Sequence, residues 1–426
     1  MTKARTVTAP KPSRQRVTMG IGSRSFAFFW ALGGGFLWWL VVPFLTLLGG
    51  KQGINSRAEA RLPIFLGLWL LLVLLGSAAA GEVSANRISG AAYGGLVWIT
   101  AGIMSHALRK LTPERNQQFI RGIIFIGALQ GLLSLVAVRL HASPLSLIAL
   151  PLSRFLGDQA GGVGVWATSR LAYTDYFGGG VVRSSGMMAT AAWSGGFACL
   201  VLILLLLGRK NLLAGGMSKL WWAVAVGLNL CSLTFSYSRF SWAILAVTVA
   251  VYLSYRALSV VQGGPLLAGL FWFCAGAVAF LLLPWQSFLL EQDSLRPGSS
   301  GTRFTSYGEG FDAATGEGLL TFLAGNGAKP YLEELGRGAG SESTYVSLLV
   351  RGGVVAVVLF VAFIMARLAS TYRARDWAGF ALVAALAVHG VVEDLDVGTL
   401  TLLLALIEPA RAALSTSSNE FAGRMP

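Results

Sequence analysis

Long apolar runs, separated by short polar or basic segments, make up most of this chain. Runs such as "LVLILLLLG" (200–208) do not alternate between apolar and polar residues, so they are unlike the strands of a transmembrane β-barrel. About 20 consecutive apolar residues are enough for a helix to cross a bilayer. The pattern therefore predicts an all-α polytopic integral membrane protein, a bundle of roughly 10–12 transmembrane helices. The predicted apolar helices are 26–48, 62–80, 90–107, 120–140, 186–208, 219–236, 239–256, 265–285, 342–366, 377–392 and 397–413.

The composition agrees with a membrane location. Hydrophobic residues make up 55% of the 426 residues and charged residues only 12%, with a mean hydropathy of +0.66. A soluble protein of this length needs more charge to cover its surface. The net charge of +14 lies mostly in the N-terminal tail and in short connections, where basic residues mark the cytoplasmic side. We therefore interpret the charge as a topology signal and expect no nucleic-acid partner.

The charge pattern also predicts how the chain is divided. We expect a basic cytoplasmic tail at 1–24, a transmembrane bundle at 25–413 and a cytoplasmic C-terminal tail at 414–426. The long connections 141–185 and 286–341 are expected outside the cytoplasm, because the basic connections between the other helices belong inside. Loops of such length usually carry function.

Segment 26–48 does not fit this scheme as one ordinary crossing, because a single crossing there would invert every later segment. It contains Gly33–Gly35 and Pro43, which break helices. We expect this segment to be broken, re-entrant or a tight hairpin.

Three arginines lie at or near the predicted outer ends of the helices: Arg183 in "VVRSSG", Arg239 in "SYSRFSW" and Arg303 in "SSGTRF". A guanidinium is a planar fork of donors that suits phosphate oxygens and stays charged at any working pH. If the three converge, they would form a site for a diphosphate. The alternative is that each anchors a helix end by extending its charged head into water.

Glu342, in "GSESTYVSLLVRGG", lies at the predicted start of an apolar helix. It is either an acid that stabilises the helix start beside capping serines, or a carboxylate that accepts a proton from an attacking sugar hydroxyl. Arg351 follows about two and a half helical turns later. An arginine at that depth is expected to pair with an acid or bind an anion.

The segment "HGVVEDLDVG" carries His389, Glu393, Asp394 and Asp396. The first, second and last of these would share one face if the helix continued. We expect the acids to be charge partners of the arginines rather than metal ligands, because one histidine with carboxylates is a common chance pattern. The three cysteines lie inside apolar runs without the spacing of a metal site. We predict no metal and no cofactor.

The order of the motifs "RSSG", "SR", "SGTR", "GNG" and "ESTYVSLLVRGGVVAVV" over residues 120–413 resembles the O-antigen ligase and polymerase superfamily. The resemblance implies a GT-C-like fold with a large extracytoplasmic loop over an outer cavity, in the bacterial cytoplasmic membrane. It implies glycan donors and acceptors linked to undecaprenyl diphosphate, with membrane lipid, a chain-length regulator and a flippase as further partners.

By the same resemblance, Arg239, Arg303 and Arg183 hold the diphosphate and Glu342 is catalytic. Four residues would support them: Arg351, Tyr345, Glu393 and Asp394. Ligases of the superfamily typically have histidine where this chain has Glu342, so the chain resembles the polymerases more closely. The rival hypotheses are a ligase or protein O-oligosaccharyltransferase of the same superfamily, and a transporter or flippase of polysaccharide precursors.

Overall fold

The computed structural model describes most of the chain between residues 58 and 395, together with four residues between 404 and 409. The described ranges are 58–81, 83, 85–110, 113–140, 174–175, 182–184, 191–258, 299–316, 318–332, 337–338, 343–395, 404, 406–407 and 409. The longer helices are α3 (Ala58–Ala79), α4 (Ala85–Lys110), α5 (Pro113–Leu140), α8 (Ala191–Leu207), α10 (Lys219–Phe235), α11 (Arg239–Leu258), α14 (Ser299–Thr315), α16 (Thr344–Arg373) and α17 (Trp377–His389). The short elements are α9 (Arg209–Ala214), α15 (Leu319–Ala324) and the antiparallel pairs β1 (Thr174–Asp175) with β2 (Val182–Arg183) and β3 (Tyr331–Leu332) with β4 (Arg337–Gly338).

The described part is helical apart from these two-residue strands, and eight of the predicted apolar segments are confirmed as helices. The loop 286–341 contains α14 and α15. Segments 26–48 and 265–285, most of 397–413 and both predicted tails lie outside the described residues.

Three helical stretches of the described part are long and apolar enough to cross a membrane: Ala58–Ala79, Asn116–Arg139 and Thr344–Arg373. Four apolar helices are shorter, at Ala191–Leu207, Lys219–Phe235, Arg239–Ser254 and Trp377–His389. These lengths are compatible with a helical membrane protein.

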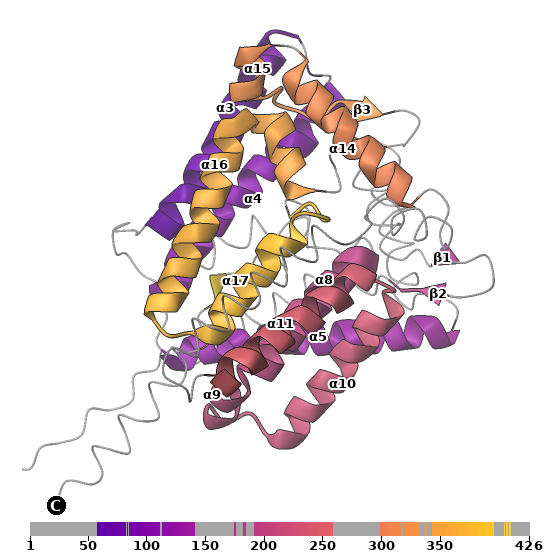
Figure 1. Ribbon diagram of the computed structural model, residues 1–426, viewed down its shortest axis with the longest axis vertical. Coiled ribbons are helices and arrows are strands. Elements are labelled where there is room, and N and C mark those ends of the chain that lie inside the picture. Colours follow the sequence, from indigo (N-terminus) through magenta and orange to yellow (C-terminus); the bar gives the residue numbers. More distant parts are fainter. Residues whose placement is uncertain are drawn as a thin grey trace, which may run out of the picture.

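The helices form two groups with α17 between them (Figure 1). In one group α3 packs against both α4 and α16, and in the other α8 packs against α5, α10 and α11. α17 contacts α16, α8 and α11 and so joins the groups. Nine consecutive residues of α8, Phe197–Leu205, have no exposed surface. A helix that is apolar on every side is expected to be enclosed in this way, and α8 is the centre of its group.

Aromatic and small residues bring the first group together. The ring of Trp98 on α4 meets Phe360 and Phe363 of α16 edge-on, with ring centroids 5.4 and 6.3 Å apart, and all three side chains are fully buried. Gly67 of α3 and Gly95 of α4 lie against each other, which lets the two backbones approach closely. Small residues have this role at the interfaces of membrane helices.

α16 is interrupted at Gly353, where φ is 64° and ψ is −165°. This backbone conformation favours glycine, and a Cβ there would collide with the Leu323 carbonyl group. The helix changes direction at this point (Figure 1). The predicted apolar segment 342–366 is therefore helical, with a break at Gly353 that the sequence did not predict.

Groups from distant parts of the chain complete the hydrogen bonding at this break. A break leaves the last carbonyls of the first helical part without their intrahelical donors. The hydrogen bonds that replace them run from Asn326 N to Val350 O (2.8 Å), from Gly327 N to Arg351 O (3.0 Å) and from Trp69 Nε1 to Gly352 O (2.7 Å). The "GNG" motif (325–327) thus caps the first part of α16.

A buried ionic cluster ties α3, α4 and α16 together away from this break. Glu59 at the start of α3 pairs with Arg109 of α4 and with Arg367 of α16, whose Nη1 lies 3.0 Å from Glu59 Oε2. Arg367 is fully buried and also donates to the Ile407 carbonyl at 3.2 Å. Removing one partner from such a cluster leaves a buried charge and typically costs about 3–5 kcal/mol.

Candidate functional site

The start of α16 is hydrogen-bonded to the segment that follows α17. Thr344 N donates to the carbonyls of Gly390 (2.8 Å) and Glu393 (3.1 Å), and Thr344 Oγ1 donates to Glu393 O at 2.8 Å. Leu395 N in turn donates to Thr344 Oγ1 at 2.9 Å. These bonds fix the chain next to Glu342 beside the residues 389–395.

Glu342 itself lies outside the described residues, but the structure defines where its helix begins. α16 starts at Thr344, and Ser343 is the N-cap, accepting from Val346 N at 3.5 Å. Glu342 therefore precedes the cap instead of occupying the first helical turn. This weakens the interpretation of Glu342 as a residue that stabilises the helix dipole, which acts mainly within the first turn.

Arg239 is the first residue of α11, and its side chain is exposed. The turn between α10 and α11 consists of Ser236–Ser238, immediately before Arg239. A guanidinium at a helix N-terminus adds to the positive end of the helix dipole, so both would attract an anion.

The other two predicted arginines lie on elements that are bound to the same end of the bundle. Arg183 is in β2, and the next residue, Ser184, donates its N–H to the carbonyl of Phe235 at the end of α10 (2.9 Å). Arg303 is on α14, where Tyr307 Oη donates to the Val391 carbonyl at 3.0 Å. The side chains of Arg183 and Arg303 are outside the described part of the structure. By these backbone positions and contacts, Arg183, Arg239 and Arg303 belong to one region of the bundle. It comprises the ends of α10 and α17 and the starts of α11 and α16. We call this region the polar end.

The polar end contains a further cation, Lys329, that the sequence did not indicate. Lys329, two residues after the "GNG" motif, forms an ion pair with Asp394, whose side chain is 2% exposed. Asp394 thus binds a lysine of the loop 286–341, and its expected role as a charge partner of the arginines stays a prediction. Neither charge lies in a recognisable motif, so only the tertiary structure reveals the pair.

One more prediction about this end needs correction. α17 ends at His389, so Glu393 does not continue its helical face, and Asp396 lies outside the described residues. Among the described residues no group of three histidine, cysteine or acidic side chains is placed to hold a metal ion. Glu393 is buried, and its carbonyl group, not its carboxylate, makes the hydrogen bonds to Thr344.

Arg351 and Tyr345, which we predicted to support the site, lie inside the bundle. Arg351 is buried, and its Nη2 donates to the Ala91 carbonyl of α4 at 2.8 Å. We expected an acid or an anion as the partner of Arg351, whereas this contact is with the main chain. Tyr345 Oη donates to the Ala387 carbonyl of α17 at 3.0 Å, so it ties α16 to α17.

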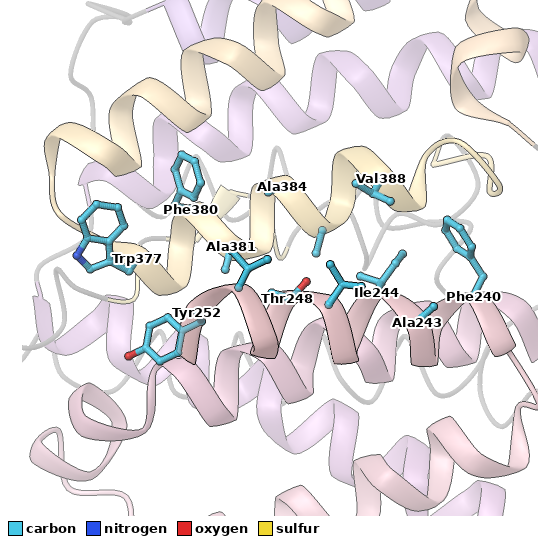
Figure 2. Close-up of a pocket in the computed structure, with 13 residues that line it drawn as sticks. Phe240, Ala243, Ile244, Thr248, Tyr252, Trp377, Phe380, Ala381, Ala384 and Val388 are labelled. Carbon is cyan, nitrogen blue, oxygen red and sulfur yellow. The ribbon is translucent and has the colours of Figure 1, made fainter. Parts of the chain in front are cut away.

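An apolar groove runs between α11 and α17, and the first residue of α11 that lines it is Phe240, which follows Arg239 in the chain (Figure 2). Its volume is about 440 Å³, and Thr248, Tyr252 and Trp377 carry the few polar side-chain atoms along its walls. Phe240 and Val388 line one end, and Tyr252 and Trp377 line the other (Figure 2). From Phe240 to Tyr252 the α-helical rise gives the groove a length of about 18 Å.

The chain matches no protein-family model and no curated protein sequence.

Proposed function

We propose that the chain is a membrane glycosyltransferase that polymerises oligosaccharide repeats linked to undecaprenyl diphosphate. The reaction would take place at the polar end, on the extracytoplasmic face of a bacterial cytoplasmic membrane, within a polytopic helix bundle. A hydroxyl of the acceptor repeat attacks the anomeric carbon of the donor glycan, and a new glycosidic C–O bond forms. The bond from that carbon to the diphosphate breaks, and the diphosphate leaves with the electron pair.

The observation that carries the proposal is the juxtaposition of Arg239 with the apolar groove. A lipid diphosphate has an anionic head and a long apolar chain, and both need a place in one site. Arg239 and the start of α11 favour the anion, and the groove that starts at the next residue offers apolar walls to the chain. The cations lower the barrier most where negative charge develops on the leaving diphosphate.

Glu342 has the role of the proton acceptor in this reaction. The hydroxyl that attacks must lose its proton, and a carboxylate within hydrogen-bond reach can take it. The adjacent Ser343 and Thr344 are held at the polar end by hydrogen bonds to Gly390 and Glu393. A ligase or protein O-oligosaccharyltransferase would use the same donor and the same arginines, and would transfer the glycan once instead of building a ladder of repeats.

One observation favours a transporter as a second candidate. Discontinuous helices with buried charged residues are typical of transporters, and α16 is broken next to the buried Arg351. In this chain the break is capped by the "GNG" segment of the loop 286–341, and the candidate anion site is at the start of another helix, α11. This one-sided arrangement favours a surface enzyme.

The groove can be tested with two matched alanines on α11. Ala243 lines the groove, whereas Ala246 is exposed on the same helix and does not line it. We expect Ala243→Trp to fill the groove and weaken the binding of radiolabelled undecaprenyl diphosphate by purified protein, and Ala246→Trp to leave it unchanged. Equal binding by both variants, or no binding by the unmodified protein, would remove the support for this site.

A further inference from the structure

The turn that precedes Arg239 is fixed by serine hydroxyl groups. Ser236 Oγ donates to the Leu233 carbonyl at 2.7 Å and accepts from Ser238 N at 3.2 Å. Ser238 Oγ lies 2.7 Å from Ser241 Oγ on the first turn of α11. Between the serines, Tyr237 has a positive φ of 49°, which is uncommon for a residue with a bulky side chain. Such a conformation persists only where the surrounding contacts hold it.

His389 extends this chain of hydroxyl groups into α17. Its Nε2 lies 3.3 Å from Ser241 Oγ, and its ring meets Phe240 edge-on with the ring centroids 6.1 Å apart. The side chain of His389 is 2% exposed and Ser241 is fully buried. Hydrogen bonds between buried polar groups fix geometry strongly, because leaving either group unsatisfied is costly.

α8 provides the surface against which the turn and the histidine pack. A Cβ at Gly196 would collide with His389 Nε2, and a Cβ at Gly195 would lie 2.6 Å from Ser238 Cβ. The two glycines therefore let α17 and the α10–α11 turn approach the same part of α8. His389, Ser241 and Ser238 form one buried path that ends directly before Arg239.

We propose that His389 is a positioning residue for Arg239, acting through Ser241 and Ser238. The inference rests on the proposed function, in which Arg239 holds the diphosphate of the donor. A guanidinium recognises a diphosphate only if its donors point at the phosphate oxygens, so the turn that carries it must be rigid. His389 supplies that rigidity from the helix that also lines the lipid groove. It touches no reacting atom in this proposal.

The motion of the turn before Arg239 can be measured without any substrate. A spin label on Arg239→Cys, in protein whose three native cysteines are replaced by alanine, reports the motion of the turn. We expect His389→Ala to sharpen the spectrum because the turn moves faster, and Ser241→Ala to do the same. His389→Gln retains a polar group near the place of Nε2 and should restore the broad spectrum. An unchanged spectrum in folded His389→Ala protein would overturn the proposal.

A matched control and a binding arm complete the test. His106 on α4 is the control histidine, and His106→Ala should leave the spectrum of the label unchanged. With Arg239 intact, we expect His389→Ala to weaken binding of undecaprenyl diphosphate about tenfold, the effect of losing about 1.4 kcal/mol of fixed hydrogen bonding. In Arg239→Lys protein the same change should have little further effect, because both act on one interaction.

The two arms separate the inference from the proposed function. If the unmodified protein binds no lipid diphosphate, the proposed function fails, while the spin-label spectra still decide whether His389 holds the turn. If His389→Gln loses binding as completely as His389→Ala although its spectrum stays broad, His389 contacts the substrate, and the positioning role is wrong.

Discussion

Arg239 is placed where a cation does not help its own helix. The N-terminus of a helix carries a partial positive charge, and an unfavourable charge there typically costs about 0.3–1 kcal/mol. A residue selected only to start α11 would be neutral or acidic. A bound anion reverses this balance, because the arginine and the helix dipole then act in the same direction. A diphosphate bound at the polar end would therefore offset the unfavourable charge of Arg239 at the start of α11.

Replacing Arg239 by lysine tests the geometry of that contact. Lysine keeps the charge but loses the planar fork, so at least one charge-assisted hydrogen bond to the diphosphate is lost. We expect donor affinity to fall about 10–150-fold, corresponding to about 1.5–3 kcal/mol, with normal amounts of protein in the membrane. The control is Arg209→Lys, since Arg209 lies over the Trp222 ring (4.7 Å to its centroid) and not at the polar end. Equal donor affinities of the Arg239→Lys and Arg209→Lys variants would indicate that Arg239 only anchors the end of its helix.

At the residue scale the candidate residues could be recognised in the sequence, but the pairing of side chains could not. The arginine motifs and Glu342 stand out because polar residues between apolar runs are conspicuous. The end of α17 could not be predicted, because it depends on a contact with a distant part of the chain. Thr344 N donates to the carbonyl of Gly390, which lies 46 positions later. The ion pair of Lys329 with Asp394 joins segments that are 65 positions apart in the chain.

At the scale of the element, α16 shows why helix positions were predictable and the break was not. An apolar run forces the backbone to satisfy its own hydrogen bonds, so the helices follow the runs directly. A break is stable only if other groups replace the lost bonds, and Asn326, Gly327 and Trp69 do this from outside the helix. The two adjacent glycines in "RGG" are compatible with a continuous helix and with a broken one.

The break predicts a large difference between two glycine substitutions. At Gly353 a Cβ would collide with the Leu323 carbonyl group, and φ is positive, so Gly353→Ala should destabilise the protein by about 1–3 kcal/mol. At Gly227 on α10 nothing lies within 4 Å of an added Cβ. There alanine should be neutral or stabilising by up to about 1 kcal/mol. The midpoint of thermal unfolding in detergent measures both, and an unchanged midpoint for Gly353→Ala would contradict the broken helix.

At the scale of the whole molecule, the two ends of the bundle differ in what their charges do. The charges of Glu59, Arg109 and Arg367 are paired with one another and buried, so that end is tied together. At the polar end Arg239 is exposed beside an apolar groove. The polar end also contains the ion pair of Lys329 with Asp394. From the charge pattern we predict that the first end faces the cytoplasm and that the polar end faces outside.

Cysteine labelling tests this orientation. Asp312 on α14 and Ala374 after α16 are both exposed, and the topology places them on opposite sides of the membrane. In a background without native cysteines, Asp312→Cys should react with an impermeant thiol reagent added to intact cells. Ala374→Cys should react only after the membrane is opened. Labelling of both residues in intact cells would contradict the predicted topology.

The most direct test is turnover by purified protein in liposomes supplied with undecaprenyl-diphosphate-linked repeats. We predict a ladder of products that differ by one repeat. Glu342→Gln should still bind the donor but form the ladder about 10²–10⁴-fold more slowly, because it removes the proton acceptor. The control Glu309→Gln, an exposed acid on α14, should match the unmodified protein. A ladder formed at the normal rate by Glu342→Gln would exclude Glu342 as the base, and unmodified protein that carries the repeats across the membrane without joining them would contradict the account as a whole.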